Sequence, residues 1–367
     1  MPIKRIDINT FLSLSLAVPV FDVRSPGEYT HAHIPGACNL PLFTDEERKV
    51  VGTTYKQKSR EAAIKIGLDY FGPKMRKMVE EVEAIVEQWA NTNSRDKKST
   101  DLVNSYHPTK KIIVHCWRGG MRSAGVAWLL DLYGFDVYTL VGGYKSFRRQ
   151  VLDIFTQSFR FRILGGYTGS GKTHVLQALE KKGETIIDLE GIAHHKGSAF
   201  GAIGMPAQPS QEMFENLLAT ELLKKNKRPI WLEDESQRLG LVNIPQPLWN
   251  TMRRSTIFFL EIPFEQRLKH IVSEYGKLEK EKIINAIIRI KKRLGGLETK
   301  TAINYLIEDN IEKSFEVLLK YYDKQYNKGL HNRENLDSLL NKIPCHTVDE
   351  TTNASQLMAS LIMEKFA

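Results

Sequence analysis

The chain of 367 residues has a formal net charge of +9, 42% hydrophobic residues and three cysteines. This length is too great for one ordinary domain and suits two or three. Three scattered cysteines exclude a disulfide framework and a CxxC metal site, and they favour a reducing, cytoplasmic setting. The excess of Lys and Arg is typical of proteins with anionic partners, such as nucleic acid or phosphorylated ligands, but also of enzymes that are merely basic.

The first half alternates strand and helix patterns. Residues 11–21, FLSLSLAVPVF, lack a signal-peptide cleavage site and are shorter than the roughly 20 residues of a membrane span, so we expect no membrane contact. They predict a short helix and then a buried strand. Strands are predicted over residues 18–24, 111–116 and 136–143, and a helix over 122–134 that stops at a glycine. The polar residues 44–107 predict a helical insertion with a flexible end near residues 91–110.

The second half also alternates β and α patterns. Strands are predicted over residues 158–166, 185–189, 228–234 and 255–262, helices over about 263–326, and a last strand and helix near the C-terminal end. Such alternation favours a parallel sheet covered by helices on both faces. We therefore expect an α/β fold with two domains, residues 1–150 and residues 158–367.

A phosphate-binding loop is predicted between the first strand and the first helix of the second domain. The sequence GYTGSGKT matches G-x-x-x-x-G-K-[ST] without departure. Its glycines allow backbone N–H groups to turn toward phosphates, the helix N-terminus adds positive potential, and the Lys and Thr suit phosphate and Mg²⁺. The predicted diphosphate-binding residues are Gly166, Tyr167, Thr168, Gly169, Ser170, Gly171, Lys172 and Thr173. The loop fits a nucleotide or another diphosphate ester.

An acidic strand end, WLEDES at residues 231–236, is expected to complete that site. In P-loop proteins a carboxylate at this position helps to hold Mg²⁺. We assign Thr173, Glu233 and Asp234 to the metal, through water, although three consecutive acids leave the choice between Glu233, Asp234 and Glu235 open. An exposed strand end without a ligand would have the same composition. No arginine finger can be chosen among Arg254, Arg267 and Arg293.

A reactive cysteine is predicted at the end of the strand over residues 111–116. The loop HCWRGGMRS has the spacing Cys-x5-Arg. Inward N–H groups, two arginines and a helix N-terminus favour the thiolate, which is a nucleophile and can hold a chalcogen adduct. The expected catalytic residues are Cys116, Arg118 and Arg122, and the loop around the thiol comprises Trp117, Gly119, Gly120, Met121 and Ser123.

The thiol loop alone leaves two kinds of chemistry open. HCx5R[ST] is also the pattern of the phosphate loop of cysteine phosphatases. Such enzymes need an acid that protonates the leaving group. Asp22 or an acid of the insertion is available for that role, but nothing marks either of them.

The upstream segment FDVRSPGEYTHAHIPGACNLPL, residues 21–42, resembles the first signature of rhodanese domains, in which a cysteine loop carries transferred sulfur. The loop from Cys116 to Arg122 is one residue longer than the usual rhodanese loop and resembles that of phosphatases with the same fold. Besides the two loops, the chain contains four segments in this order: VGTTYKQ, DLEGIAHHKGSAFG, QPSQEMFEN and WLEDESQRLG. On these loops and segments, nearly the whole chain resembles tRNA 2-selenouridine synthases. The resemblance implies a rhodanese-like domain with a helical insertion, then a P-loop NTPase-like domain with added helices.

The resemblance also implies a selenotransferase that replaces the sulfur of wobble 2-thiouridine in tRNA with selenium. Selenophosphate would be the donor, and geranyl transfer from geranyl diphosphate would first turn the sulfur into a leaving group. The P-loop would hold geranyl diphosphate with Mg²⁺, and Cys116 would receive selenium while Arg118 and Arg122 bind the donor phosphate. The anticodon loop would enter between the domains, and a selenophosphate-producing enzyme would be a further partner.

Residues 188–201, DLEGIAHHKGSAFG, are predicted to form a loop beside the P-loop. As a lid over diphosphate or RNA it would use His195, Lys196, Gly197 and Ser198, and a plain glycine-rich connection is the competing interpretation.

Two hypotheses compete with a selenotransferase. One is a cysteine phosphatase fused to an ATP-dependent kinase-like domain. The other is a nucleotide-gated RNA-binding module with a degenerate rhodanese domain, against which the intact cysteine loop argues.

Overall fold

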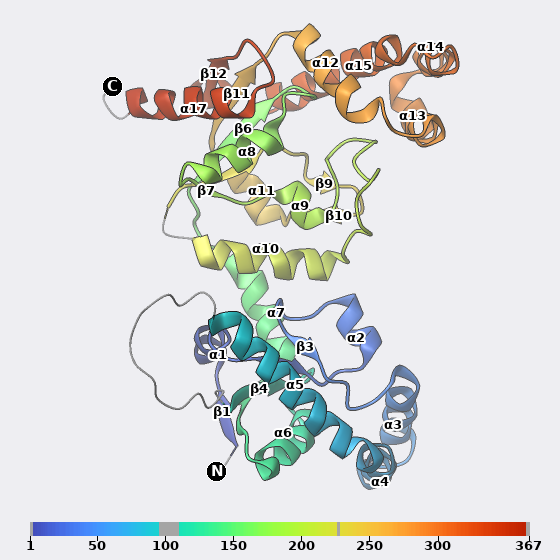
Figure 1. Ribbon diagram of the computed structural model, residues 1–367, viewed down its shortest axis with the longest axis vertical. Coiled ribbons are helices and arrows are strands. Elements are labelled where there is room, and N and C mark those ends of the chain that lie inside the picture. The colour runs from blue at the N-terminus through green and yellow to red at the C-terminus, as the bar shows by residue number, and fades with distance from the viewer. Residues whose placement is uncertain (1–2, 95–109, 226–227, 365–367) are drawn as a thin grey trace. The chain divides into compact units, whose positions relative to one another are not determined.

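The computed structural model describes residues 3–94, 110–225 and 228–364. The chain divides into two compact units, Met1–Asp153 and Ile154–Ala367 (Figure 1). Each unit contains a five-stranded sheet whose strand pairings are all parallel. Helices pack on both sheets, as expected for chains that alternate strands and helices.

In the first unit the strand order is β1–β5–β4–β2–β3. The strands are β1 (Lys4–Ile6), β2 (Val20–Asp22), β3 (Cys38–Asn39), β4 (Lys111–His115) and β5 (Asp136–Leu140). β4 lies at the centre of the sheet, between β5 and β2. Functional loops commonly follow the carboxyl ends of parallel strands, and the residue that follows β4 is Cys116.

Helices and one 3-10 turn connect these strands. They are α1 (Ile8–Leu14), α2 (Pro26–His31), α3 (Asp45–Gln57), α4 (Arg60–Phe71), the 3-10 helix η1 (Gly72–Lys74), α5 (Met75–Ser94), α6 (Met121–Tyr133) and α7 (Gly143–Ile154). α3 begins at a capping box formed by Thr44 and Glu47. α6 ends at Gly134, whose φ of 112° is a conformation that side-chain-bearing residues rarely adopt.

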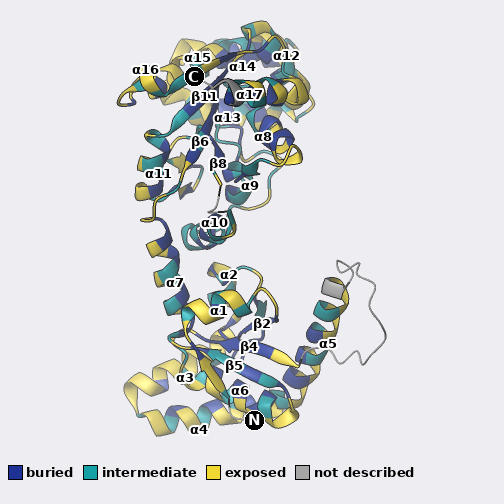
Figure 2. Ribbon diagram, turned by 90° about the vertical axis from the view of Figure 1, so that its left-hand side faces the viewer, coloured by how far each residue is buried: buried dark blue, intermediate teal, exposed yellow. Residues whose placement is uncertain are grey.

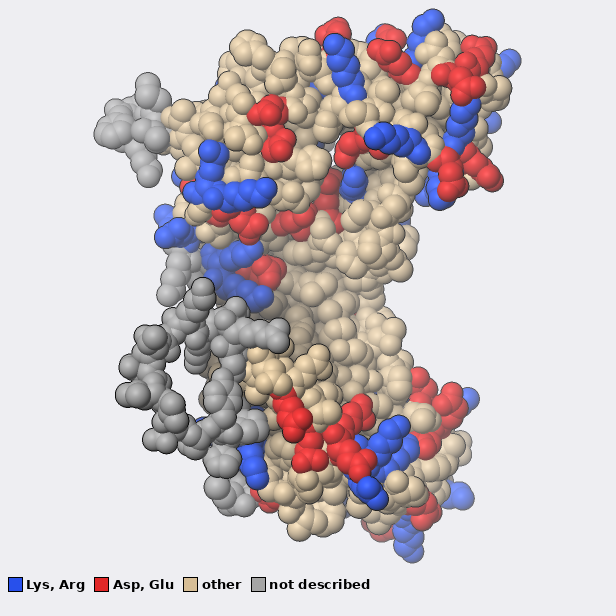
Figure 3. Space-filling model, viewed as in Figure 1, with Lys and Arg blue, Asp and Glu red and all other residues tan. Residues whose placement is uncertain are grey.

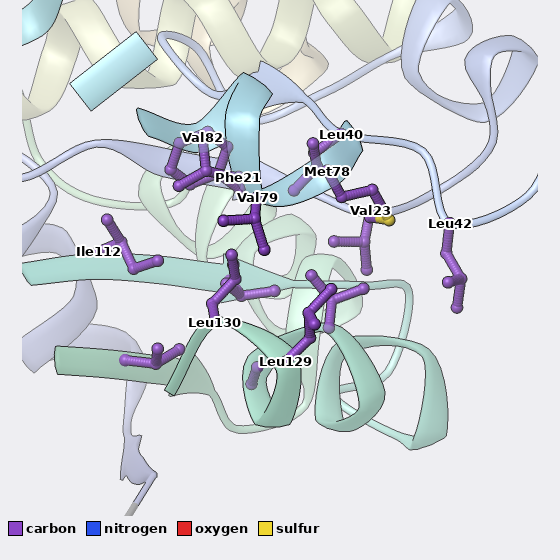
Figure 4. Close-up of a cluster of buried hydrophobic side chains, with 14 of the residues drawn as sticks. Phe21, Val23, Leu40, Leu42, Met78, Val79, Val82, Ile112, Leu129 and Leu130 are labelled. Atoms are coloured by element: carbon purple, nitrogen blue, oxygen red, sulfur yellow. The ribbon is translucent and has the colours of Figure 1, made fainter. Parts of the chain in front are cut away.

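α5 and α6 supply much of the apolar core of the first unit. Figure 4 shows Val79 and Val82 of α5 and Leu130 of α6 in one cluster with Phe21 and Ile112 of the sheet. Each of these side chains is at most 8% exposed. α5 is therefore a structural layer of this unit, although it lies within the stretch interpreted as an insertion. α3 and α4, by contrast, are largely exposed on their outer faces (Figure 2).

The longer elements predicted in the first half are confirmed. The predicted strands are β2, β4 and β5, the helix over 122–134 is α6, and residues 11–21 contain the end of α1 and the start of β2. The sequence does not predict β1 and β3, because strands of two or three residues are too short to show alternation. Most of the end of the insertion, near residues 91–110, lies outside the described residues.

In the second unit the strand order is β12–β11–β6–β8–β7. The strands are β6 (Phe161–Gly166), β7 (Thr185–Ile186), β8 (Ile230–Glu233), β11 (Thr256–Glu261) and β12 (Leu340–Pro344). All were predicted, although β7 is shorter and β12 begins earlier than expected. A separate hairpin pairs β9 (Arg238–Leu239) with β10 (Val242–Asn243), and the sequence pattern does not show it.

Two apolar cores form in this unit. Its helices are α8 (Lys172–Lys181), α9 (Leu189–Ala193), α10 (Gln211–Lys225), α11 (Gln246–Arg253), α12 (Phe264–Tyr275), α13 (Lys280–Leu294), α14 (Gly296–Ile307), α15 (Ile311–His331), α16 (Leu336–Leu339) and α17 (Glu350–Glu364). One core joins the sheet to α8 and α17. The other joins α12, α13, α14 and α15 to Phe200, and these four helices confirm the helices predicted over residues 263–326.

Candidate functional site

The thiol of Cys116 lies in a tight loop after β4. The residue is 3% exposed, its Sγ lies 3.2 Å from Ser123 Oγ, and it accepts a hydrogen bond from the N–H of Gly120 at 3.4 Å. Burial by itself raises the pKa of the thiol, but hydrogen bonds from Ser123 and from the backbone of Arg118 and Gly120 outweigh burial and lower the pKa below its ordinary value. The loop therefore favours the thiolate.

This thiol loop interlocks with the turn that follows β5. Gly119 has a φ of 66°, and a Cβ there would lie 2.6 Å from the carbonyl oxygen of Leu140. Gly143 has a φ of 56°, and a Cβ there would clash with the carbonyl oxygen of Cys116. That carbonyl also accepts a hydrogen bond from the N–H of Tyr144 at 2.9 Å. Two glycines at positive φ thus hold the curvature that directs N–H groups at the sulfur.

Gly143→Ala should disturb the thiol loop, whereas Gly120→Ala should leave its shape intact. At Gly143 the added methyl meets backbone, but at Gly120 no atom lies within 4 Å and φ is −102°. We expect Gly143→Ala to destabilise the protein by about 1–3 kcal/mol and to raise the pH at which iodoacetamide alkylates Cys116. Thermal melts and alkylation rates against pH measure both effects. Identical alkylation profiles for the two variants would contradict the interlock.

The two arginines of the thiol loop have different surroundings. Arg122 Nη1 donates to Glu28 Oε2 at 2.7 Å, and Glu28 also pairs with Arg48 at 2.7 Å. Burial raises the pKa of Glu28, but the hydrogen bond and charge of Arg122, with smaller contributions that include Arg48, lower it to about 2. Glu28 is thus ionised and fixes the guanidinium of Arg122. Arg118 is exposed, and it has no ion-pair partner among the residues that the structure describes.

The Asp-Val-Arg part of the first signature forms a buried ion pair beneath this loop. Arg24 Nη2 lies 2.6 Å from Asp22 Oδ2, and both side chains are at most 1% exposed. The guanidinium also lies 3.8 Å from the centroid of the Tyr144 ring, so it links the segment after β2 to the start of α7. Since Asp22 is buried and paired, it does not fit the acid that would protonate a phosphatase leaving group.

The predicted phosphate-binding residues form one loop between β6, the central strand of the second sheet, and α8. Gly169 and Gly171 have φ of 82° and 67°, as the inward-turned backbone requires. Lys172 Nζ donates to the carbonyl oxygen of Gly166 at 3.1 Å. The ammonium group therefore lies over the loop, where a bound phosphate would take over as its acceptor.

Side chains from α12 and α15 hold this P-loop in place. Arg267 is 3% exposed, donates to the carbonyl oxygen of Thr168 at 3.1 Å and pairs with Asp323 at 2.7 Å. The hydroxyl of Tyr326 accepts a hydrogen bond from the N–H of Gly166 at 3.2 Å. These contacts make Arg267 a brace of the loop backbone, which differs from the role of an arginine finger.

The acids of WLEDES have different partners. Glu233, buried at the end of β8, accepts a hydrogen bond from Thr173 Oγ1 at 2.7 Å, and Glu190 Oε2 lies 3.0 Å from the same hydroxyl. Asp234 instead accepts from the Tyr326 hydroxyl at 2.6 Å and pairs with Arg333. The structure therefore brings Glu233 to Thr173, whereas Asp234 is engaged elsewhere.

The surroundings of Glu233 fit a nearby cation. Burial and then the charge of Glu190 raise the pKa of Glu233 well above its ordinary value, and its Oε2 is buried without a hydrogen-bond partner in the described part of the chain. Mg²⁺ is commonly held by one or two carboxylates together with waters and substrate phosphates. Thr173 and Glu233 are the residues that would hold it here. Within the described ranges, no group of three or more His, Cys, Asp or Glu could hold a metal ion.

A cavity of about 670 Å³ opens over the P-loop. The acids Glu190 and Glu235 line it, and so do the aromatic rings of Tyr275 and Tyr322 and the apolar side chain of Ile271. Burial raises the pKa of both tyrosines, so that their hydroxyls are neutral. The cavity thus combines the P-loop with a partly apolar wall.

Three of the predicted lid residues, Lys196, Gly197 and Ser198, line this cavity. Gly197 has a φ of 64°, and a Cβ there would lie 2.5 Å from Glu235 Oε2 and 3.0 Å from Glu190 Oε1. A glycine is therefore required where this segment passes these two partly buried acids.

The other predicted lid residue, His195, is 9% exposed and is not among the residues that line the cavity. Burial lowers the pKa of His195. Phe200 anchors the same segment in the core of the four helices, and the N–H of Ala199 donates to Tyr322 at 3.2 Å. The segment is thus a wall of the site that is pinned at one end.

Two comparisons with known proteins cover most of this chain. The model of the tRNA 2-selenouridine synthase AAA domain matches residues 159–342, and that of the rhodanese-like domain matches residues 12–150. The tRNA 2-selenouridine synthase of Pseudomonas putida (strain W619) is 35% identical over 359 residues, which cover 88% of this chain and 92% of that protein. The chain belongs to the tRNA 2-selenouridine synthase family. The family member from Nitrosomonas europaea is 37% identical over 279 residues, which cover 74% of this chain and 67% of that protein.

Family membership confirms the predicted α/β fold class, with its rhodanese-like and P-loop-type halves. No helix in the described part of the chain is long and apolar enough to cross a membrane. Sequence reasoning did not assign Glu28, Glu190, Tyr326 or Arg333 to a site. Glu28 lies in the signature over residues 21–42 and Glu190 in the segment over residues 188–201, so their motifs were a signal for both. No motif marks Tyr326 and Arg333.

Proposed function

We propose that this chain is a tRNA-modifying enzyme that replaces the sulfur of wobble 2-thiouridine with selenium from selenophosphate, by way of an S-geranylated base. The observation that carries this proposal is the presence, in one member of this family, of a thiol loop that favours the thiolate and a separate P-loop with Lys172 over its backbone. The sulfur at C2 is a poor leaving group. Alkylation turns it into a thiol that can depart.

Geranyl transfer belongs to the P-loop in this proposal. The backbone of residues 166–173 and Lys172 bind the diphosphate, while Thr173 and Glu233 hold Mg²⁺, which when bound supplies charge that stabilises the departing diphosphate. The sulfur of the base attacks C1 of the geranyl group, and the C–O bond to diphosphate breaks. The apolar and aromatic wall at Ile271 and Tyr275 offers a surface for the hydrocarbon chain.

Selenium delivery belongs to the thiol loop. Cys116 is the nucleophile that activates the donor, and the exposed Arg118 and the fixed Arg122 bind its phosphate group. The same loop with an alkyl phosphate would require an acid, and Asp22 does not fit that role. This difference favours selenium transfer over the cysteine phosphatase alternative.

The charges of the second unit support an RNA partner. The face shown in Figure 3 carries basic and acidic side chains side by side. The C-terminal half of α13 differs from this mixed pattern, because its charged side chains are all basic and exposed. None of them is ion-paired with a residue that the structure describes. They are Arg289, Lys291, Lys292 and Arg293. Unpaired cations on one helix suit the phosphates of tRNA. A cytoplasmic location, where tRNA is modified, is part of the proposal.

Nucleoside mass spectrometry tests the function directly. The full-length protein is incubated with 2-thiouridine-containing tRNA, geranyl diphosphate and selenophosphate, and the tRNA is then digested. We expect S-geranyl-2-thiouridine when selenophosphate is omitted and 2-selenouridine when both reagents are present. Unchanged 2-thiouridine in both reactions, together with rapid hydrolysis of a chromogenic phosphomonoester, would favour the phosphatase alternative.

A further inference from the structure

The loop around Cys116 has features of a phosphoryl-transfer site, but Asp22, the acid of the first signature, is buried in an ion pair with Arg24 and does not suit protonation of a leaving group. The sulfur accepts the N–H of Gly120, and Glu28 holds the guanidinium of Arg122, which lies six residues further along the chain. The Cys-x5-Arg spacing suits a phosphate-sized ligand. A leaving alkoxide would need a proton from an acid, whereas a weakly basic leaving group would depart without one.

We propose that the thiolate of Cys116 attacks the phosphorus of selenophosphate, so that a phosphocysteine forms and selenide leaves. This step rests on the proposed function, which names the donor. An S–P bond forms, and the P–Se bond of the monoprotonated donor breaks with its electron pair on selenium, which leaves with the donor's proton as hydrogenselenide. Water then attacks phosphorus, the S–P bond breaks, inorganic phosphate departs with the protons of the water, and the thiolate is restored. Hydrogenselenide attacks C2 of the geranylated base and expels geranylthiolate.

The electron balance distinguishes this step from direct transfer of selenium to sulfur. Selenium keeps the same oxidation state in selenophosphate and in selenide, so attack at phosphorus needs no oxidant. A thiolate that took selenium itself would leave the bonding electron pair on phosphorus, and phosphate could then form only with an oxidant. In this proposal Cys116 therefore does not receive selenium itself, as the family resemblance implies, but activates the donor by attack at phosphorus.

Neighbouring side chains have defined parts in this step. A guanidinium has five N–H donors in a fixed fork, and the pair with Glu28 uses one edge of Arg122. The remaining donors and the exposed Arg118 are available to phosphoryl oxygens. Ser123 Oγ, 3.2 Å from Sγ, stabilises the sulfur as a leaving thiolate when water attacks the phosphocysteine.

Labelled selenophosphate tests the covalent step in the full-length protein. Geranylated tRNA is supplied with selenophosphate radiolabelled at phosphorus or, in a parallel reaction, at selenium, and the reactions are stopped with denaturant. We expect the phosphorus label on the peptide that contains Cys116 and no label in Cys116→Ser. Ser123→Ala should retain several-fold more phosphorus label than the wild type, because breakdown of the phosphocysteine slows while its formation continues.

Two outcomes separate this proposal from the function on which it rests. If the wild type transfers selenium to tRNA while the protein carries the selenium label and never the phosphorus label, attack at phosphorus is wrong and the proposed function stands. If Cys116 carries the phosphorus label but the tRNA gains no selenium, attack at phosphorus is supported and the proposed function is wrong.

Discussion

Cys116→Ser should abolish selenium transfer and leave geranylated tRNA to accumulate. A serine hydroxyl is far less ionised than a thiol whose pKa is lowered by its loop, so the variant lacks the nucleophile that activates the donor. The P-loop lies in the other compact unit and is not altered. In the nucleoside assay, 2-selenouridine should fall to background while S-geranyl-2-thiouridine rises.

The other cysteines provide matched controls for this result. Burial raises the pKa of Cys38, and it raises that of Cys345 to about 11, so neither thiol is activated. Cys38→Ser and Cys345→Ser should therefore make 2-selenouridine at rates close to that of the wild type. If Cys116→Ser still produces 2-selenouridine, Cys116 is not the nucleophile and the assignment of the thiol loop is wrong.

Lys172→Ala should suppress geranylation by weakening the grip on the diphosphate. Lys172 is the cation over the P-loop, at 3.1 Å from the carbonyl oxygen of Gly166. Loss of a hydrogen bond to a charged group costs about 1.5–3 kcal/mol, which is roughly a tenfold to a hundredfold increase in Kd. Titration calorimetry with geranyl diphosphate and Mg²⁺ measures the change, and the nucleoside assay should show little S-geranyl-2-thiouridine.

Lys181→Ala is the control for this variant, because Lys181 is exposed at the other end of α8. It removes the same charge from the same helix and should leave the Kd for geranyl diphosphate unchanged. Equal affinities of Lys172→Ala and the wild type would show that the P-loop does not bind this substrate. Selenation of pre-geranylated tRNA should survive in Lys172→Ala, which separates a loss of binding from a loss of fold.

Features that are contiguous in sequence could be predicted. Residues 166–173 and the thiol loop each form a short segment between a strand and a helix, so the local pattern and the position in the sheet agree. The signature around Asp22 indicated the fold of the first domain but not the role of the Asp22 carboxylate. Only the structure shows that Asp22 pairs with Arg24 under the loop, because packing decides which side of a strand end a side chain faces.

Contacts between distant segments could not be predicted from one sequence. Glu28 of α2 pairs with Arg122 of α6, 94 residues away in the chain, and Tyr326 contacts Gly166 from a helix with no motif of its own. Which of the three consecutive acids Glu233, Asp234 and Glu235 lies beside Thr173 also depends on a contact with a distant segment. Arg333, which follows α15, engages Asp234 and so leaves Glu233 beside Thr173. Periodicity predicts that such helices exist but says nothing of which side chains they direct at a loop.

α15 contacts both the P-loop and the segment over residues 196–199 at the cavity. Asp323 pairs with Arg267, which donates to the P-loop backbone. The hydroxyl of Tyr326 accepts from the N–H of Gly166, and that of Tyr322 accepts from the N–H of Ala199. A shortened protein without α12–α15 would keep the strands but lose the supports of both walls. The helical segment therefore cannot be trimmed to obtain a minimal enzyme, and any engineering of the cavity has to treat that helix as its frame.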